Sequence, residues 1–438
     1  MNLLLIDTEA MGLDLAYRAA EAGHAVKLYR LQDKPVRDGE GFPGVTLVDS
    51  WKEHMNWAKS GLVVTTGNVK LTRELDRYRQ YGFPIFAPTH ASAQLEINRK
   101  TGMDLMSKHG LNIAPFKMFD SLKAAIDHVV KTDERYVFKT MGDEEDKSLS
   151  YVCHSPEDMI GWLEKRIEEG FKPKGPVMLQ ECIDMVGEVG IAAWVGPKGF
   201  IDKCELSFEH KKMMSGNFGP NTGETGTVCK YVTEDPLVDL IYEFEDDLIK
   251  LGHIGDIAIN GGVNAKGYWP FEWTARLGWP DFFIRTAMHQ GDPIQWMRDL
   301  LDGKDTLKIR GEIGIGVLMT QPPFPAKNEE PDKTLGIQVH GLAGVWDNVH
   351  PIQLMIGEGP KISNGKLERQ DTMQTTGEYV LVATSLGKTV AAAREKVYGA
   401  ISEIKLANAM VRDDIGEALE QQLPKLHALG YCKDVEYS

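Results

Sequence analysis

ELSFEHKKMMSGNFGPNTGETGTV, residues 205–228, is a stretch in which a basic cluster precedes a run rich in glycine, asparagine and threonine. The cluster is His210, Lys211 and Lys212, and the run GPNTG occupies residues 219–223. Glycine adopts positive φ without steric cost, and Asn and Thr side chains hydrogen-bond locally, so we expect a shaped loop. Such loops present backbone N–H groups to anions. The stretch therefore predicts a site for a small anionic group, although GPNTG also occurs in ordinary turns and HKK on solvated surfaces.

A second stretch, WPFEWTARLG at residues 269–278, places one carboxylate at the end of an apolar run. Glu272 is followed four residues later by Arg276, and Gly278 and Pro280 close the segment. A carboxylate at a strand end can hold Mg²⁺, and a guanidinium can bind a carboxylate or phosphate through two parallel hydrogen bonds. The same spacing is also typical of an ion pair on a helix. Together with the first stretch, it favours a site for an anionic substrate.

The totals of the sequence indicate a globular chain with an acidic surface. Its 438 residues are enough for two to four structural units. The 64 Asp and Glu residues outnumber the 49 Lys and Arg residues and give a formal net charge of −15. Such a surface repels polyanions, so we expect no direct nucleic-acid binding. A local basic pocket for a phosphorylated small molecule is compatible with this charge.

Cysteine usage and the lack of long apolar runs favour a cytoplasmic protein. The five cysteines are widely spaced and form no CxxC pair, which argues for a reducing compartment and against a zinc site or a disulfide framework. The first residues, MNLLLIDTEAMG, lack the basic flank and apolar length of a signal peptide, and no membrane-spanning run follows. We therefore expect no membrane association.

The N-terminal residues alternate between apolar runs and a helical pattern. Residues 2–6 and 25–29 are short apolar runs, and residues 13–22 between them have helical spacing. This is the pattern of a β-α-β unit in an open α/β sheet. The connecting turn reads DTEAMG at residues 7–12, with two acids and one glycine, where a dinucleotide site would carry GxGxxG. The turn therefore disfavours phosphate binding and argues against a Rossmann dehydrogenase.

The middle of the chain carries further basic candidates. We expect a helix over residues 92–109, which includes Arg99, and strands over residues 136–140 and 177–181. Lys139 lies between apolar neighbours in the first of these strands. Seen alone, such a residue is ordinarily an edge-strand lysine.

Three more elements are predicted toward the C-terminus. A helix is expected over residues 234–251, and a hairpin over residues 254–271 with its turn at Asn260-Gly261. Farther along, the composition becomes rich in glycine and β-forming residues, with one strand expected over residues 334–339.

Five motifs, spread over nearly the whole chain, resemble those of a known family. They are IFAPT followed by AQLE between residues 85 and 96, the HKK and GPNTG pair, Glu272 with Arg276, TSLGKTV at residues 384–390, and DIG at residues 414–416. In this combination they are similar to the motifs of the ATP-grasp ligases and, within them, of the phosphoribosylamine–glycine ligase family. Each motif alone is weak.

The resemblance implies an α/β protein with the ATP-grasp fold. The implied segments are an N-terminal open α/β domain (residues 1–98), a small ATP-grasp lobe with its linker helix (99–190), a large ATP-grasp lobe (191–310) and a small β-rich α+β C-terminal domain (311–438). The implied activity is amide formation: ATP phosphorylates a carboxylate, and an amine then displaces phosphate from the acyl phosphate. Such a transfer needs neutralising charge around the γ-phosphate and exclusion of water. The implied cofactors are ATP and Mg²⁺ or Mn²⁺, the implied partners are small-molecule substrates, and the chain would be a monomer or homodimer.

The resemblance also implies a nucleotide site. Lys139 would contact the α- and β-phosphates, and Arg99 or Lys100 would make a second basic contact. The adenine hinge and the ribose contact would be formed by Gln180, Glu181, Ile183 and Glu188.

The remaining implied roles fall mainly on the two stretches quoted first. Glu272 would hold the metal, and Thr274 stands where the family has its metal-bridging asparagine. Asn260 or Asp256 would supply a further oxygen ligand. The amino-acid carboxylate and the anionic intermediate would be bound by Arg276, Lys211, Asn221, Thr222 and Gly223.

The sequence departs from the family in the amine-substrate pocket. Residues 7–14 read DTEAMGLD where the family has GNGGREHA, and residues 66–71 read TGNVKL where it has GPEAPL. The loop over the phosphates, AAGKGV in the family, is DEEDKSL at residues 143–149, which leaves Lys147 as its basic contact. Trp279 replaces an aspartate and would narrow the amino-acid end of the site.

These departures leave the acceptor open. One alternative is the family's own substrate pair, phosphoribosylamine and glycine. The other is glycine or a similar small amino acid joined to a different amine or nucleotide. Outside the enzymes, the acidic loop and Thr274 are compatible with a nucleotide-binding protein without turnover, or with a scaffold that has kept only the fold. We favour a ligase, because the residues implied for ATP, metal and carboxylate retain workable spacing.

Overall fold

The computed structural model describes residues 1–31, 37–140, 150–326 and 330–438. These residues form two compact units. Unit 1 comprises Met1–Ala93, Val189–Ala258 and Thr274–Ser438, and unit 2 comprises Gln94–Glu188 and Ile259–Trp273. Lys147 and the rest of the predicted loop over the phosphates lie outside the described residues. The finer division into four segments remains a prediction.

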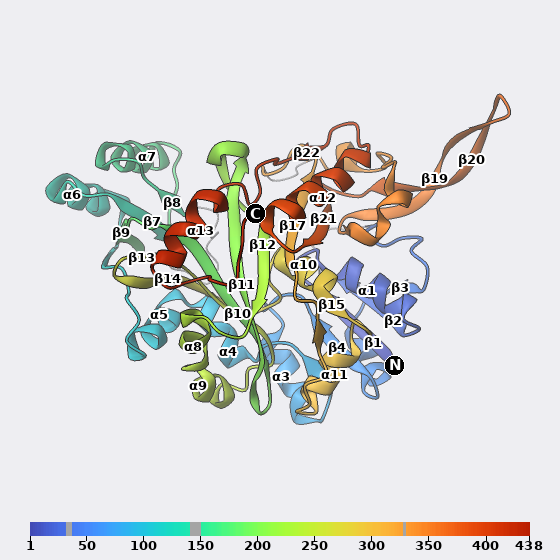
Figure 1. Ribbon diagram of the computed structural model, residues 1–438, viewed down its shortest axis with the longest axis horizontal. Helices are drawn as coiled ribbons and strands as arrows, with labels where there is room; N and C mark the ends of the chain where they lie inside the picture. The colour runs from blue at the N-terminus through green and yellow to red at the C-terminus, as the bar shows by residue number, and fades with distance from the viewer. Residues whose placement is uncertain (32–36, 141–149, 327–329) are drawn as a thin grey trace. The chain divides into compact units, whose positions relative to one another are not determined.

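Unit 1 begins with a five-stranded parallel sheet of order β3-β2-β1-β4-β5 (Figure 1). Its elements are β1 (Asn2–Asp7), α1 (Gly12–Glu21), β2 (Ala25–Arg30), β3 (Val45–Leu47), α2 (Met55–Ala58), β4 (Leu62–Thr65), α3 (Thr72–Gln80) and β5 (Ile85–Phe86). The central strand β1 is apolar and almost entirely buried, as expected for a parallel sheet with covered faces. The predicted β-α-β unit is confirmed. Across the sheet, the sequence order runs backward from β3 to β1 and forward from β4 to β5. The order therefore reverses between the neighbouring strands β1 and β4.

The larger part of unit 1 contains an antiparallel sheet of order β10-β11-β12-β17-β21-β18, with β22 paired to β17. Its strands are β10 (Gly187–Gly196, which enters the unit at Val189), β11 (Gly199–Met214), β12 (Phe218–Val232), β17 (Ile313–Thr320), β18 (Val349–Pro351), β21 (Tyr379–Gly387) and β22 (Met410–Val411). Helix α10 (Asp281–Met288) packs against β12, β17 and β21, so its apolar side chains complete the core over this sheet.

The GPNTG run, predicted as a loop, lies inside β12. The hairpin of β11 and β12 pairs Lys212 with Asn221, and the chain reverses at Gly216 and Asn217, which have φ of 70° and 58°. The prediction of a loop is wrong because pairing with β11 holds the glycine-rich run extended. Two register shifts, on either side of Lys212, absorb the irregularity of the sequence.

The other elements of unit 1 lie mainly in its second half. They are α8 (Pro236–Tyr242), α9 (Glu245–Lys250), β15 (His289–Gln290), α11 (Gln295–Leu301), β16 (Lys308–Ile309), β19 (Leu354–Ser363), β20 (Lys366–Thr375), α12 (Val390–Glu403) and α13 (Leu419–Ala428). The single helix predicted over residues 234–251 is two helices, and the break lies where Phe244 turns inward and is fully buried. The strand predicted over residues 334–339 is absent from the described chain there, because Gly336, with φ of 79°, interrupts the extension.

Unit 2 contains a four-stranded antiparallel sheet of order β6-β9-β7-β8. Its strands are β6 (Phe116–Phe119), β7 (Tyr136–Thr140), β8 (Tyr151–Val152) and β9 (Val177–Glu181), and its helices are α5 (Arg99–Lys108), α6 (Leu122–Thr132), α7 (Pro156–Glu168) and the second half of α4 (His90–Ile97). Phe138 and Leu179 pack with Val129 and Leu163 in its core. Lys139 is not on an edge, because β7 is paired on both sides, with β8 and β9.

Two further predictions about unit 2 need correction. The helix predicted over residues 92–109 is divided between α4 and α5 at Asn98, whose side chain caps α5 by accepting from the backbone N–H of Thr101 at 3.2 Å. The strand β13 (Gly255–Asn264) runs through the predicted turn at Asn260-Gly261 and reverses only before β14 (Gly267–Thr274). Gly261 serves close strand packing instead, since a Cβ there would lie 2.5 Å from the carbonyl oxygen of Trp269.

No helix within the described ranges is both long and apolar enough to cross a membrane.

Candidate active site

Lys139 is the most deeply placed of the residues predicted to contact phosphate. Only 7% of the residue is exposed, yet its Nζ donates to Oε1 of Gln180 on the neighbouring strand β9 at 2.7 Å. Gln180 in turn donates from Nε2 to the carbonyl oxygen of Ala114 at 3.2 Å. A buried ammonium group is costly unless it is hydrogen-bonded. The interior strand therefore holds a positive charge at a fixed position in unit 2.

The predicted adenine hinge follows directly where β9 ends at Glu181. The side chain of Glu181 is exposed, and its backbone N–H donates to the carbonyl oxygen of Pro115 at 2.8 Å. Ile183 is half-buried, and Glu188 is exposed at the start of β10. Their contacts with adenine and ribose remain predictions.

Arg99 and Lys100, the two alternatives for a second basic contact, lie in different surroundings. The Arg99 side chain is 10% exposed, and its Nη1 is 3.8 Å from Oε2 of Glu272, the predicted metal ligand. The Lys100 side chain is 72% exposed and pairs with Asp104, one helical turn along α5. The structure thus brings Arg99, and not Lys100, beside another predicted site residue.

The predicted metal ligands are oxygen donors on β13 and β14. Glu272 and Thr274 are two residues apart on β14 and therefore point to the same side of the strand. Asn260 is half-buried on β13. Within the described ranges, no three His, Cys, Asp or Glu side chains gather as metal ligands. One carboxylate with neutral oxygens still suits Mg²⁺, which is usually bound through one or two carboxylates together with substrate phosphates.

Asp256, the other candidate for a metal oxygen, is engaged elsewhere. Its carboxylate accepts from Nη1 of Arg285 at 2.8 Å and from the backbone N–H of Gly278 at 3.0 Å. Both Asp256 and Arg285 are buried, and the guanidinium also stacks over the ring of Trp194. A carboxylate held in this way serves the core of unit 1, and the role of Asn260 as a metal ligand remains a prediction.

The HKK cluster on β11 is less basic than the sequence suggests. His210 is buried, and its Nε2 accepts from the backbone N–H of Gly416 at 3.0 Å. Burial, with a further contribution from Arg412, lowers the pKa of His210 to about 4, so the ring is neutral at physiological pH. Lys211 is half-buried and pairs with Glu209 at 3.0 Å. Counting His210 as a cation is therefore wrong.

The residues predicted to bind the amino-acid carboxylate lie on β12 and just beyond β14. Thr222 donates from Oγ1 to the carbonyl oxygen of Lys211 at 2.8 Å, which fixes the strand at Asn221 and Gly223. The ring of Trp279 lies against Gly223, because a Cβ on this glycine would be 3.9 Å from Cδ1 of the indole. Both residues belong to unit 1, and the narrowing of the amino-acid end of the site by this ring remains a prediction.

Sequence reasoning missed how the tip of the β11–β12 hairpin is held. Arg412 donates from Nη1 to the carbonyl oxygen of Lys212 and from Nη2 to Oδ1 of Asn217, each at 2.8 Å. Asp414, ion-paired with Arg412, accepts from the backbone N–H of Gly216 at 2.8 Å. The signal was present in the sequence, because the DIG motif that resembles the family contains Asp414.

A group of acids beside the predicted carboxylate site was also missed. Glu224, immediately after Gly223, is buried, and its Oε1 has no hydrogen-bond partner. Burial, followed by the charges of Glu209 and Asp281, raises the pKa of Glu224 well above its ordinary value. Burial likewise raises the pKa of Asp281 to about 6. The signal was Glu224 itself, since the family motif GPNTGGMG has glycine at this position.

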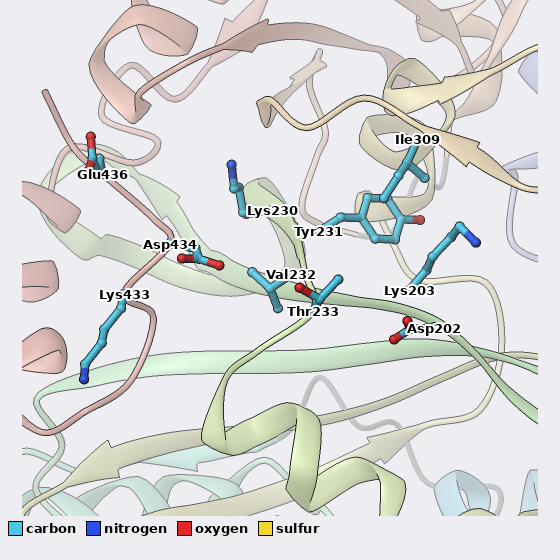
Figure 2. A pocket seen from close by; sticks show the side chains of 10 residues that line it. All are labelled: Asp202, Lys203, Lys230, Tyr231, Val232, Thr233, Ile309, Lys433, Asp434 and Glu436. Carbon is cyan, nitrogen blue, oxygen red and sulfur yellow. The ribbon is translucent and has the colours of Figure 1, made fainter.

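An open pocket of unit 1 lies apart from these residues (Figure 2). Its volume is about 360 Å³. Its walls carry charges of both signs and include none of the predicted site residues; they are Asp202, Lys203, Lys230, Tyr231, Val232, Thr233, Ile309, Lys433, Asp434 and Glu436. The lysines are already occupied in part, because Lys203 pairs with Asp305 and Lys230 donates to the carbonyl oxygen of Gly311. Because none of the predicted site residues lines this pocket, it is not taken as the candidate active site.

Known proteins share both the sequence pattern and the fold, although no family model matches the chain. A phosphoribosylamine–glycine ligase from Clostridium acetobutylicum is 24% identical over 361 residues, covering 78% of this chain and 81% of the relative. One from Streptococcus pneumoniae is 24% identical over 440 residues, covering 95% of this chain and 99% of the relative.

Solved structures agree with these relatives. The crystal structure of phosphoribosylamine–glycine ligase from Thermotoga maritima superimposes with a TM-score of 0.69 at 18% identity, covering 95% of this chain and all of the other. The biotin carboxylase domain of the Hydrogenobacter thermophilus 2-oxoglutarate carboxylase, solved with MgADP, ADP and bicarbonate, has a TM-score of 0.60 at 10% identity, covering 98% of this chain and 95% of that domain.

The fold and these relatives define a carbon–nitrogen ligase with the ATP-grasp fold. Within that superfamily, the chain is similar to the phosphoribosylamine–glycine ligases, at about 24% identity over most of its length.

Proposed function

We propose that this ligase uses ATP and Mg²⁺ to activate the carboxylate of a small amino acid, glycine by analogy with its relatives, and joins it to an amine. The observation that carries the proposal is Lys139, a buried ammonium group on an interior strand of unit 2, hydrogen-bonded to Gln180. A lysine is expensive to bury, and a nucleotide phosphate is the kind of anion that its ammonium group binds as a point charge.

Each unit supplies its own part of the chemistry. In unit 2, Lys139 and Arg99 neutralise phosphate oxygens, Gln180, Glu181 and Ile183 position the base, and Glu188 accepts from the ribose hydroxyls. The terminal phosphoryl group passes to the carboxylate and forms an acyl phosphate with release of ADP. The amine then attacks the acyl carbon, phosphate leaves, and the amide remains.

The metal, when bound, neutralises charge on the phosphate oxygens. Glu272 is the carboxylate ligand, and Thr274 and Asn260 are neutral oxygen donors. On unit 1, Arg276 binds the amino-acid carboxylate, and Asn221, Thr222 and Gly223, with Lys211, face the anionic intermediate. Glycine is favoured over larger amino acids because Trp279 lies against Gly223.

The test is ADP release by the purified protein with MgATP, a small amino acid and an amine. We expect release that depends on both co-substrates, with glycine preferred among amino acids. The amine panel includes freshly generated phosphoribosylamine, the amine named by the relatives, alongside unphosphorylated amines. ATP binding without release by any pair would contradict the proposal and favour a nucleotide-binding protein without turnover.

A further inference from the structure

The parallel sheet of unit 1 has one place where a ligand is generally expected. In open α/β sheets, ligands bind beside the carboxyl ends of the strands where the strand order reverses. Here that point lies between β1 and β4, and the turns that follow Asp7 and Thr65 lie beside it. Helix α1 starts at Gly12 in the first turn, and free N–H groups at a helix N-terminus attract anions. We call this region the β1–β4 crevice.

The anion position of the β1–β4 crevice is already filled by the chain itself. The carboxylate of Asp7 accepts from the backbone N–H of Gly12 at 2.9 Å, of Met11 at 3.1 Å and of Glu9 at 3.2 Å. Asp7 is buried, and burial alone would raise its pKa, but the Arg30 guanidinium, the N–H groups of Gly12 and Met11 and the hydroxyl of Thr66 hold the pKa below its ordinary value. A carboxylate of the chain itself, held by these hydrogen bonds, therefore occupies the N-terminus of α1.

The second turn is fastened to the same carboxylate. Thr66 donates from Oγ1 to Oδ1 of Asp7 at 2.8 Å and accepts from the backbone N–H of Thr8 at 2.9 Å. The two turns whose sequences depart from the family are thus parts of one hydrogen-bonded network. A ligand phosphate could reach the backbone N–H groups only by displacing Asp7 and breaking this link.

The charge around Asp7 is also unfavourable for a phosphate. Arg30 lies opposite Asp7 in the register of β1 and β2 and forms ion pairs with both Asp7 and Asp38. Glu9 lies over the second turn, since a Cβ on Gly67 would be 2.4 Å from its Oε1. Asp7 and Asp38 therefore share the guanidinium of Arg30 between two carboxylates. A phosphate with up to two negative charges would meet net repulsion.

We propose that the acceptor amine presents an uncharged or cationic group, and not a phosphate, to the β1–β4 crevice, and that Asp7 sets this specificity by occupying the anion position. The identity of the ligand as the acceptor rests on the proposed function; the filled anion position does not. The proposal sets this chain apart from relatives whose named amine, phosphoribosylamine, carries a phosphate.

The first experiment removes the internal anion and asks whether an external one replaces it. Asp7→Ala leaves Arg30, the hydroxyl of Thr66 and the backbone N–H groups facing a vacated position. We expect inorganic phosphate to bind this variant at least about tenfold more tightly than the parent, measured by calorimetry with the nucleotide site saturated by a non-hydrolysable MgATP analogue. Acetate or formate should raise the Tm of the variant and leave that of the parent unchanged.

A matched control is Asp292→Ala, which removes a carboxylate that also accepts two backbone N–H groups, those of Ile294 and Gln295, outside the β1–β4 crevice. It should gain no affinity for phosphate. If Asp7→Ala does not fold, Asp7→Asn removes the charge with little change of shape. The Tm of the parent and of Asp7→Asn is then measured in phosphate and in chloride. We expect phosphate to raise the Tm of Asp7→Asn and to leave that of the parent unchanged. The proposal would be overturned if the parent binds phosphate and either Asp7 variant binds it more weakly.

A second experiment connects the filled position to the acceptor. ADP release is measured with glycine and pairs of amines that differ only by a phosphate. We expect the unphosphorylated member to be preferred by at least tenfold in kcat/KM in the parent, and Asp7→Ala to lose that preference. A preference for phosphoribosylamine in the parent overturns the inference about specificity. If no amine stimulates release but Asp7→Ala gains phosphate binding, the proposed function fails and the filled anion position stands.

Discussion

The ammonium group of Lys139 donates to the side-chain oxygen of Gln180 at 2.7 Å, between two adjacent interior strands of unit 2. This hydrogen bond keeps the lysine head in one place while its aliphatic stem is buried. Lys139→Ala should therefore weaken ATP binding at least about tenfold, or about 1.4 kcal/mol, because a fixed charge at the phosphates is lost. Direct measurement of ATP affinity by calorimetry checks this.

The control is Lys100→Ala, which removes a lysine of the same unit whose side chain is 72% exposed and paired with Asp104. It should bind ATP within about twofold of the parent, since exposed ion pairs contribute little. Equal ATP affinity in Lys139→Ala and the parent would remove Lys139 from the nucleotide site.

Lys139 also illustrates what the sequence could and could not predict. The alternation of residues 136–140 indicates a strand directly, because side-chain direction has a period of two. Whether that strand is an edge or interior depends on β8 and β9, which lie farther along the chain. The local pattern contains no information about that pairing, so the edge-strand interpretation was reasonable and wrong.

The same limit applies to turns. GPNTG and Asn260-Gly261 both have the composition of turns, and both are extended, because each run is paired with a partner strand or packed closely on one. The β-α-β start was predictable since its apolar runs are short-range signals. The network of Asp7 and Thr66 was not, since it joins residues 59 positions apart; the sequence indicated only that acids stand where a phosphate turn would need glycine.

Glu272→Gln should abolish Mg²⁺-dependent ADP release while leaving the Tm within about 2 °C of the parent. The side chain is 36% exposed, and its contact with Arg99 is 3.8 Å, so the pair adds little stability. The amide keeps the shape but loses the charge that Mg²⁺ prefers. Steady-state kinetics over a Mg²⁺ titration, with a thermal melt of the same sample, provides the readout. Full activity at ordinary Mg²⁺ concentration would place the metal elsewhere.

Trp279→Leu should widen the amino-acid end of unit 1, because the indole lies against Gly223. We expect kcat/KM for alanine or serine relative to glycine to rise by about tenfold, the usual effect of a change in pocket size of this order. Trp346→Leu, a half-buried tryptophan of the same unit that packs against Tyr17, is the control and should leave the ratio unchanged. A constant ratio in Trp279→Leu would mean that the indole does not select the amino acid.

The buried ring of His210 should make stability fall as the solution is acidified. Its pKa is lowered from 6.5 to about 4, chiefly by burial, so between these values the unfolded chain binds a proton that the folded chain does not. The contribution of His210 to the free energy of unfolding is therefore complete above pH 6.5 and is lost as pH falls toward 4, by about 2 kcal/mol at pH 5.

His210→Gln cannot titrate in this range, and its side-chain oxygen can still accept from the backbone N–H of Gly416. Urea unfolding gives the free energy of unfolding at pH 7 and at pH 5. The difference between these two values should be smaller in the variant than in the parent, by about 2 kcal/mol. Because every other titrating group is shared, the comparison isolates His210, and equal differences in the two proteins would mean that the ring is protonated, or accessible to protons, in the folded state.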